Sequence, residues 1–156
     1  WEDTTFFELC RNKPGWQHTR YLGCVRPEEV YGFLKISDVG LSTLYPIENY
    51  LTSLPVKVFE YMACGLPVVM SNFDYWRQMF PSGARFVDAM SVEQIAASIS
   101  ELVSGSESAR EMAASGRAFV CKSYVWESEA RKLENIYKRL LGSSRFALSS
   151  RTACQT

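Results

Sequence analysis

The sequence predicts an α/β fold in which helices cover both faces of a parallel β-sheet. Short apolar runs rich in valine and leucine alternate with segments whose apolar residues have helical spacing. This alternation favours parallel strands, because parallel neighbours are joined by a crossover connection that is usually a helix. The chain has 156 residues, of which 47% are apolar and 13% aromatic. That is enough for one domain with a substantial core.

Three elements are expected before residue 38. Residues 2–11 have helical spacing, and a cluster of helix-breaking residues follows them. The short apolar run RYLGC at 20–24 is expected to form a strand. The next helix begins at Pro27, because proline fits a first helical turn and the two glutamates after it favour the positive end of the dipole. This helix should end near Ser37.

A second strand and a short helix are expected next. VGLSTLY at 39–45 is an apolar run that a proline ends, and a polar loop should continue to Ser53. A helix then starts at Pro55, with Ser53 as its cap, and Gly65 and Pro67 stop it. Helical spacing places one set of residues on its buried side, namely Val56, Phe59, Met62 and Ala63. The exposed side then carries Lys57, Glu60, Tyr61 and Cys64.

The remaining sequence is expected to hold two more strands and a helical end. PVVMS at 67–71 and ARFV at 84–87 are the third and fourth strands, with a short helix at 75–80 between them. Three helices should follow, at 91–104, 107–121 and 126–141. Trp126 and Tyr137 are expected to anchor the last helix in the core. Residues 142–156 have no periodicity, so we expect a domain at 1–141 and a disordered tail.

Charge and cysteine content exclude several classes of function. Lys plus Arg and Asp plus Glu number 17 each, so no basic field predicts a nucleic-acid partner. The five cysteines include no C-x-x-C pair and His18 is the only histidine, so neither a metal site nor a disulfide framework is expected. A cytoplasmic location fits best. Contact with the inner face of a membrane is an alternative for Lys132, Lys138 and Arg139, but interleaved glutamates favour a solvated face.

The helix from Pro55 offers the chemistry of a nucleotide site. A helix N-terminus attracts anions through its free N–H groups and its dipole, and Lys57 adds a positive charge there. Glu60, one turn later, can accept hydrogen bonds from a diol such as the hydroxyls of a ribose. Together they predict a nucleoside diphosphate. The pattern alone fits equally a solvated helix with a Lys–Glu surface pair worth about 0.3–0.5 kcal/mol.

A family resemblance favours the first interpretation. SLPVKVFEYMACGLPVV at 53–69, followed by SNF, resembles the donor-site signature of GT-B-fold glycosyltransferases, particularly the retaining family 4. Three further segments resemble that family in the same order, namely RYLGCVRPEEVY, SDVGLSTLYP and YVWESEARKLENIYKRL. The resemblance runs from about Leu22 to Leu141. It implies a Rossmann-like, C-terminal donor-binding domain that is incomplete at its N-terminal side.

The resemblance also implies roles for individual residues. Glu60 corresponds to the glutamate that holds the donor ribose, and Lys57 faces the diphosphate. The backbone of Leu54, Pro55 and Val56 approaches that diphosphate, and Ser53 is a further candidate for binding the nucleotide sugar. Cys24, Val25 and Arg26 lie where the base pocket forms. A solvated arginine is an equal alternative for Arg26. Thr52 stands where many members have a glutamate that touches the sugar, so Thr52, Asn49 or Glu48 are candidates for that contact.

The implied activity is transfer of a sugar from a nucleotide diphosphate sugar to a glycan or lipid-linked acceptor, as in polysaccharide biosynthesis. No metal or other cofactor is expected, and the catalytic residues are not assigned. The acceptor domain and the first strands of the family fold are missing, and no initiator Met is present. We therefore expect a fragment that does not catalyse transfer alone. A nucleotide-sugar epimerase of similar fold and a non-catalytic nucleotide-binding module are the alternatives.

Overall fold

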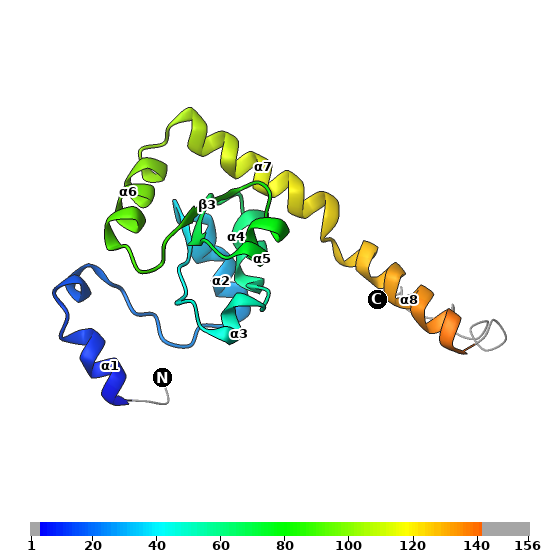
Figure 1. The fold of residues 1–156 in the computed structure, drawn as a ribbon, viewed down its shortest axis with the longest axis horizontal. Coiled ribbons are helices and arrows are strands. Elements are labelled where there is room, and N and C mark those ends of the chain that lie inside the picture. The colour runs from blue at the N-terminus through cyan, green and yellow to red at the C-terminus, as the bar shows by residue number, and fades with distance from the viewer. Residues whose placement is uncertain (1–3, 142–156) are drawn as a thin grey trace. The chain divides into compact units, whose positions relative to one another are not determined.

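The computed structural model describes residues 4–141 and shows a mixed α/β fold (Figure 1). Its sheet has three parallel strands in the order β1-β2-β3, namely β1 (Gly40–Ser42), β2 (Val68–Ser71) and β3 (Ala84–Val87). The α/β class with a parallel sheet is thus confirmed. The expected tail at 142–156 lies outside the described residues. The chain divides into two compact units, Trp1–Gly32 and Phe33–Thr156, which are described separately.

The first unit contains helices and irregular segments. It holds α1 (Thr4–Arg11), a 3-10 helix η1 (Pro14–His18) and the start of α2 (Pro27–Lys35). The ring of Phe7 lies 5.6 Å from that of Trp16 and 5.1 Å from that of Tyr21, centroid to centroid. The prediction of a strand at 20–24 is wrong. These residues pair with no strand in the described chain, and Gly23 has φ +68°, outside the range of extended backbone.

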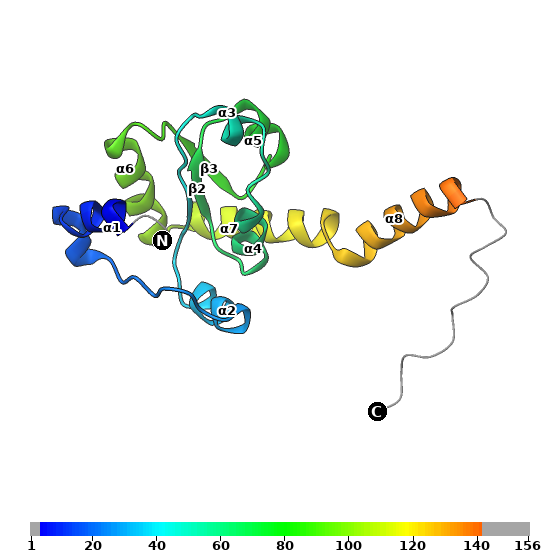
Figure 2. The same cartoon turned by 90° about the horizontal axis from the view of Figure 1, so that it is seen from below.

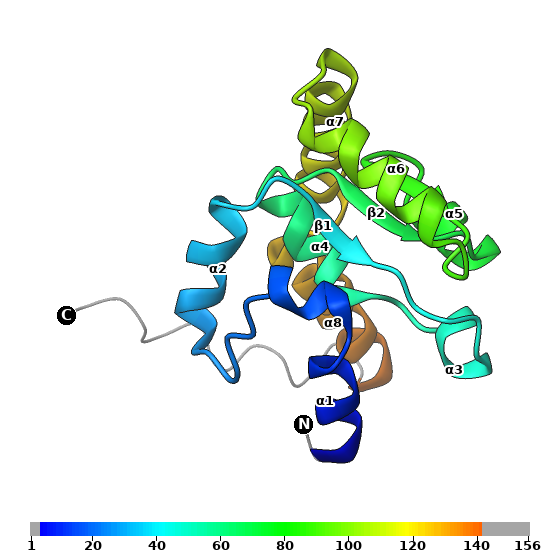
Figure 3. The ribbon, with the colours of Figure 1, turned by 90° about the vertical axis from the view of Figure 1, so that its left-hand side faces the viewer.

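The sheet of the second unit is covered on both faces, as predicted. α4 (Val56–Ala63) lies on one face, where Val58 and Met62 pack with Val68 and Met70 of β2. α6 (Val92–Val103) lies on the other, where its Leu102 joins a cluster with Val69. Successive side chains of a strand point to opposite faces, which explains why β2 is buried throughout. Figure 3 shows α4 and α6 on opposite sides of the sheet.

Two further helices complete this unit. α7 (Glu107–Ser123) is labelled in Figure 2. It contributes Ala109 to the cluster of α6 and Val120 to the cluster of α4. α8 (Trp126–Leu141) follows it, at the residues expected for the last helix. The prediction that Trp126 and Tyr137 anchor this helix in the core is wrong, because their side chains are 70% and 48% exposed. Within residues 4–141, no helix is both long and apolar enough to cross a bilayer.

The strand expected at 39–45 is shorter than predicted. β1 ends at Ser42. Two residues later, the Ser71 hydroxyl replaces strand pairing for the backbone of Leu44. It accepts a hydrogen bond from the Leu44 amide and donates one to the Leu44 carbonyl, both at 2.7 Å. The loop after it, expected to be irregular, contains the short helix α3 (Glu48–Leu51). α5 (Asp74–Met79) follows β2, close to the expected position. These connections bring α3, the start of α4 and α5 to the edge where the strands end.

Candidate functional site

The carboxyl ends of the three strands meet at one edge of the sheet, since all three are parallel. Open parallel sheets bind their ligands outside this edge. The chain leaves β1 there, passes through α3 and enters α4 at Val56. The N-terminus of α4 is therefore on the side of the sheet where a ligand is expected.

The first turn of α4 has free amide groups. Pro55 precedes the helix, with φ −79° and ψ 87°, and is not its first residue as expected. Ser53 does not cap the helix, and its carbonyl instead accepts a hydrogen bond of 2.7 Å from the indole Nε1 of Trp76. The first amide bonded to the preceding loop is that of Val58, at 2.9 Å from the Pro55 carbonyl. Among residues 4–141, the amides of Val56 and Lys57 have no acceptor, so both can bind a ligand.

Lys57 is a cation in an unfavourable place. Its side chain is half-buried, and this burial lowers the pKa of its ammonium group. It has no ion pair with any residue of the described chain. The helix dipole also disfavours positive charge at an N-terminus. A bound anion would offset both the burial of this charge and its repulsion by the helix dipole. A partly buried cation at a helix N-terminus is therefore typical of an anion site.

Glu60 follows one turn later on an exposed part of α4. The Lys–Glu surface pair that the pattern also allowed is not formed: no ion pair joins Lys57 and Glu60. The next residue, Tyr61, was expected on the exposed side of α4, but it is half-buried and packs against the core. It lies over β1, where a Cβ on Gly40 would come within 2.3 Å of its ring. Burial, and secondly the charge of Glu60, raise the pKa of Tyr61. Tyr61 thus anchors α4 on the sheet while Glu60 stays open to solvent.

The other predicted residues of the second unit precede this turn in the chain or belong to it. Thr52 ends α3 and is exposed, as are Ser53 and Leu54, whereas Pro55 is buried. Val56 was expected on the buried side of α4 but is 65% exposed, and Val58 takes that place. The difference arises because α4 turns the side that carries Val58 and Met62 toward the sheet, an orientation that helical spacing alone does not fix. Glu48 and Asn49 lie in α3 and are exposed.

The residues predicted for the base pocket lie in the first unit. Cys24, Val25 and Arg26 are exposed and irregular in structure. Arg26 donates from its backbone amide to Glu29 Oε2 at 2.9 Å, and its Nε lies 3.4 Å from the same oxygen. These bonds, the backbone one first, lower the pKa of Glu29. Here Arg26 makes a local contact that fixes the start of α2, and its role toward a base stays a prediction.

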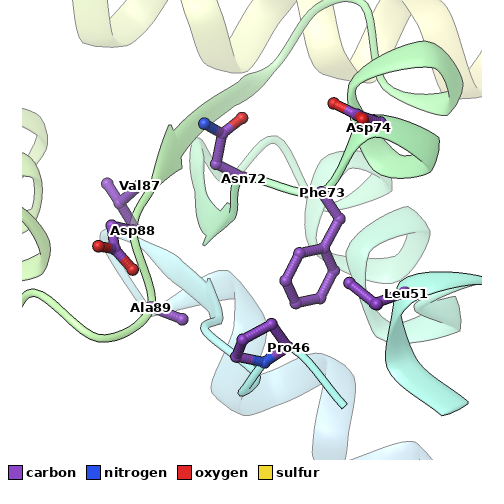
Figure 4. Close-up of a pocket in the computed structure, with 8 residues that line it drawn as sticks. All are labelled: Pro46, Leu51, Asn72, Phe73, Asp74, Val87, Asp88 and Ala89. Atoms are coloured by element: carbon purple, nitrogen blue, oxygen red, sulfur yellow. The ribbon is translucent and has the colours of Figure 1, made fainter. Parts of the chain in front are cut away.

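A pocket of about 450 Å³ opens at the same edge of the sheet (Figure 4). Its lining comes from the last residue of β3, from the segments that follow the three strands, and from α3 and α5. It consists of Pro46, Leu51, Asn72, Phe73, Asp74, Val87, Asp88 and Ala89. None of the predicted donor-site residues lines it, although Leu51 directly precedes Thr52. The signal in the sequence was a set of polar residues within three positions of a strand end, namely Asn72 and Asp74 after β2 and Asp88 after β3.

Comparison with known proteins decides the family. A family model described as glycosyl transferase-like matches residues 4–135. The chain belongs to this family. The expectation of a glycosyltransferase is confirmed at this level, whereas the assignments to the GT-B fold and to family 4 stay predictions. Among the described residues, no three His, Cys, Asp or Glu side chains are grouped as ligands for a metal ion.

A curated relative gives further context for this glycosyl transferase-like chain. It is similar to O-antigen chain mannosyltransferase B of Escherichia coli, with 29% identity over 142 residues. The matched segment is 90% of this chain and 35% of the relative, so the chain spans about a third of that protein's length. No solved structure matches the chain.

Proposed function

We propose that this chain is the C-terminal, donor-binding part of a retaining glycosyltransferase with a GT-B fold of family 4 type. Such an enzyme transfers a sugar from a nucleotide diphosphate sugar to a glycan or lipid-linked acceptor. The observation that carries the proposal is the first turn of α4, where Lys57 is partly buried without a counter-ion beside two amides without acceptors. This turn suits a diphosphate, and Glu60 suits the ribose next to it.

Each group at this turn has a distinct role in the proposal. The amides of Val56 and Lys57 and the Lys57 ammonium bind the diphosphate. They also stabilise the negative charge that develops on it as the glycosidic bond breaks. Their positions are fixed before the reaction, so they need no reorganisation and no metal to neutralise the leaving group. Glu60 accepts hydrogen bonds from the ribose hydroxyls, which distinguishes a nucleotide from other diphosphates. Thr52, Asn49 and Glu48 remain candidates for contacts to the sugar.

The relative suggests the substrates of the whole protein. Its name describes an enzyme that transfers mannose and relates it to the O-antigen chain. We therefore include mannose among the transferred sugars and a polysaccharide among the acceptors. The chain corresponds to about a third of that relative, so we expect it to bind a donor without completing the transfer. An epimerase or a non-catalytic module could use the same nucleotide site, but family membership favours transfer.

Titration of the chain with UDP, GDP and ADP by calorimetry tests the proposal. We expect at least one nucleotide to bind, and Glu60→Ala to weaken it about 10- to 100-fold through loss of hydrogen bonds to a charged group. Glu111→Ala, at an exposed glutamate of α7, is the matched control and should bind as the wild type does. Circular dichroism must show that each variant is folded. Absence of nucleotide binding by a folded chain, or equal affinities of both variants, would reject the proposal.

A further inference from the structure

We propose that the pocket at the carboxyl edge of the sheet is a second binding site, which takes a neutral saccharide. This site is separate from the nucleotide site at α4. The assignment of the saccharide as the acceptor glycan rests on the function proposed above, whereas saccharide binding itself does not. The pocket volume of about 450 Å³ lies in the usual range of ligand sites, about 300–1,000 Å³.

The lining of the pocket combines an apolar wall with polar groups. Figure 4 shows Pro46, Leu51 and Phe73 together on one side, with Asn72 and Asp88 across from them. A sugar ring has the complementary composition, since its C–H face is apolar and its hydroxyl groups lie around its rim. The apolar wall would receive the ring face, and the polar side chains would bind its hydroxyls.

Part of the hydrogen-bonding capacity of these polar groups is unused. One oxygen of Asp88 accepts from the Met90 amide at 2.9 Å, and the Asn72 oxygen accepts from Arg77 Nη1 at 3.3 Å. Within residues 4–141, the second oxygen of Asp88, the Asn72 amino group and the Asp74 carboxylate have no partner. The pocket therefore offers both donors and acceptors, as binding of hydroxyl groups requires.

Three exposed tyrosines lie next to lining residues in the sequence. Tyr45, Tyr50 and Tyr75 are each adjacent in sequence to a lining residue, and their side chains are 63%, 37% and 37% exposed. α3, which carries Tyr50, packs against α5, which carries Tyr75. A tyrosine ring offers an apolar face and a polar tip at little cost in conformational entropy, which suits the alternating surface of a saccharide.

The charge of the pocket favours a neutral ligand over an anionic one. Two of its lining residues, Asp74 and Asp88, are carboxylates, and the nearby cation Arg77 already contacts Asn72. A phosphate or a uronic acid would be repelled by these carboxylates, whereas a neutral sugar would not. The contrast with the cationic first turn of α4 separates the two sites. The loop through Leu51 leads directly into Thr52 and Pro55, so a glycan in this pocket would lie beside the donor.

The test is an NMR titration of the 15N-labelled chain with the neutral trisaccharides mannotriose, maltotriose and cellotriose, and with anionic trigalacturonate. We expect at least one neutral trisaccharide to shift amide signals of residues 45–51, 72–75 and 87–89 at about 10 mM, since a millimolar Kd is typical of few hydrogen bonds. Trigalacturonate should not. Asn72→Ala and Tyr50→Ala should each weaken this response about 3- to 10-fold. Gln78→Ala and Tyr31→Ala are the matched exposed controls, and should respond as the wild type does.

Three results would overturn the proposal. These are no shift at these amides with any neutral trisaccharide, equal binding of trigalacturonate, or full retention of the response in both Asn72→Ala and Tyr50→Ala. Unaltered signals of distant residues show whether each variant is folded. Saccharide binding without nucleotide binding would reject the donor-site proposal alone, and nucleotide binding without saccharide binding would reject this one alone.

Discussion

Replacing Gly116 with alanine should destabilise the chain, although alanine favours helices. Gly116 lies within α7, where this helix contacts Met62 of α4 and Gly83, the residue before β3. A Cβ on Gly116 would lie 2.9 Å from the Cα of Gly83 and 3.2 Å from the Cγ of Met62. The first contact is with the backbone of a residue at φ +82°, so a change of rotamer cannot relieve it.

Two opposing effects set the size of this change. Alanine gains about 0.5–1 kcal/mol over glycine in a helix interior. Overpacking a well-packed site costs about 1–3 kcal/mol. The overpacking cost exceeds the helix-propensity gain here because backbone must move, so we expect a net loss of about 1–2 kcal/mol. In a chain of this size such a loss lowers the Tm by about 2–8 °C.

Urea unfolding followed by circular dichroism measures this effect. Gly32→Ala is the matched control, because Gly32 lies in α2, is exposed, and has nothing within 4 Å of the added Cβ. It should gain about 0.5–1 kcal/mol from helix propensity alone. If Gly116→Ala is as stable as Gly32→Ala, α7 does not approach Gly83 and Met62 as closely as described, and the support of α4 by α7 is refuted.

Three further predictions concern the proposed donor site. Lys57→Met should raise the Tm at neutral pH. Burial lowers the pKa of Lys57 in the folded chain, so the charged lysine destabilises the fold at any pH below that pKa. The gain in Tm should shrink as the pH rises toward 10.5, the value in the unfolded chain. A gain that is independent of pH, or equal in the exposed control Lys35→Met, would contradict this. Trp76→Phe removes a partly buried hydrogen bond of 2.7 Å to the Ser53 carbonyl. It should cost about 1–3 kcal/mol in urea unfolding and weaken nucleotide binding, and wild-type stability would refute the role of this bond. Replacing Mg²⁺ with EDTA should change nucleotide affinity in calorimetry by less than about twofold, because fixed protein charges neutralise the diphosphate; a larger loss would indicate a metal.

Helix boundaries were predictable because local side chains set them. The Ser91 hydroxyl accepts from the Gln94 amide, and the Ser106 hydroxyl accepts from the Ala109 amide, both at 3.2 Å. These capping interactions span three residues, so the sequence alone shows where α6 and α7 begin. Pro27 and the two acidic residues after it predicted α2 for the same reason.

Features that depend on distant partners were less predictable. RYLGC is as apolar as the real strands, but a strand forms only where a neighbour pairs with it. The sequence showed that α8 has an apolar side, but whether that side is buried depends on what packs against it. Trp126 and Tyr137 of this helix are exposed. Likewise, the orientation of α4 on the sheet, and not its spacing alone, decided that Val58 is buried and Val56 is not.

The candidate site divides in the same way. Lys57 and Glu60 were found from one short segment, because the start of a helix and its charges are local features. The structure adds that Lys57 is partly buried and does not pair with Glu60. The pocket combines Asn72, Asp88 and Leu51, which lie far apart in the sequence and come together only when the sheet forms. The sequence therefore showed which segments follow the strands, but not how their side chains combine into one pocket.

The most direct test of the donor site asks whether Glu60 binds the ribose. Calorimetry would compare the best-bound nucleoside diphosphate with its 2′,3′-dideoxy analogue, in the wild type and in Glu60→Ala. We expect loss of the hydroxyls to weaken binding to the wild type about 10- to 100-fold, and to have almost no effect on Glu60→Ala, because the two changes remove the same interaction. Equal losses in both proteins would show that Glu60 does not contact the ribose, and would contradict the proposed donor site.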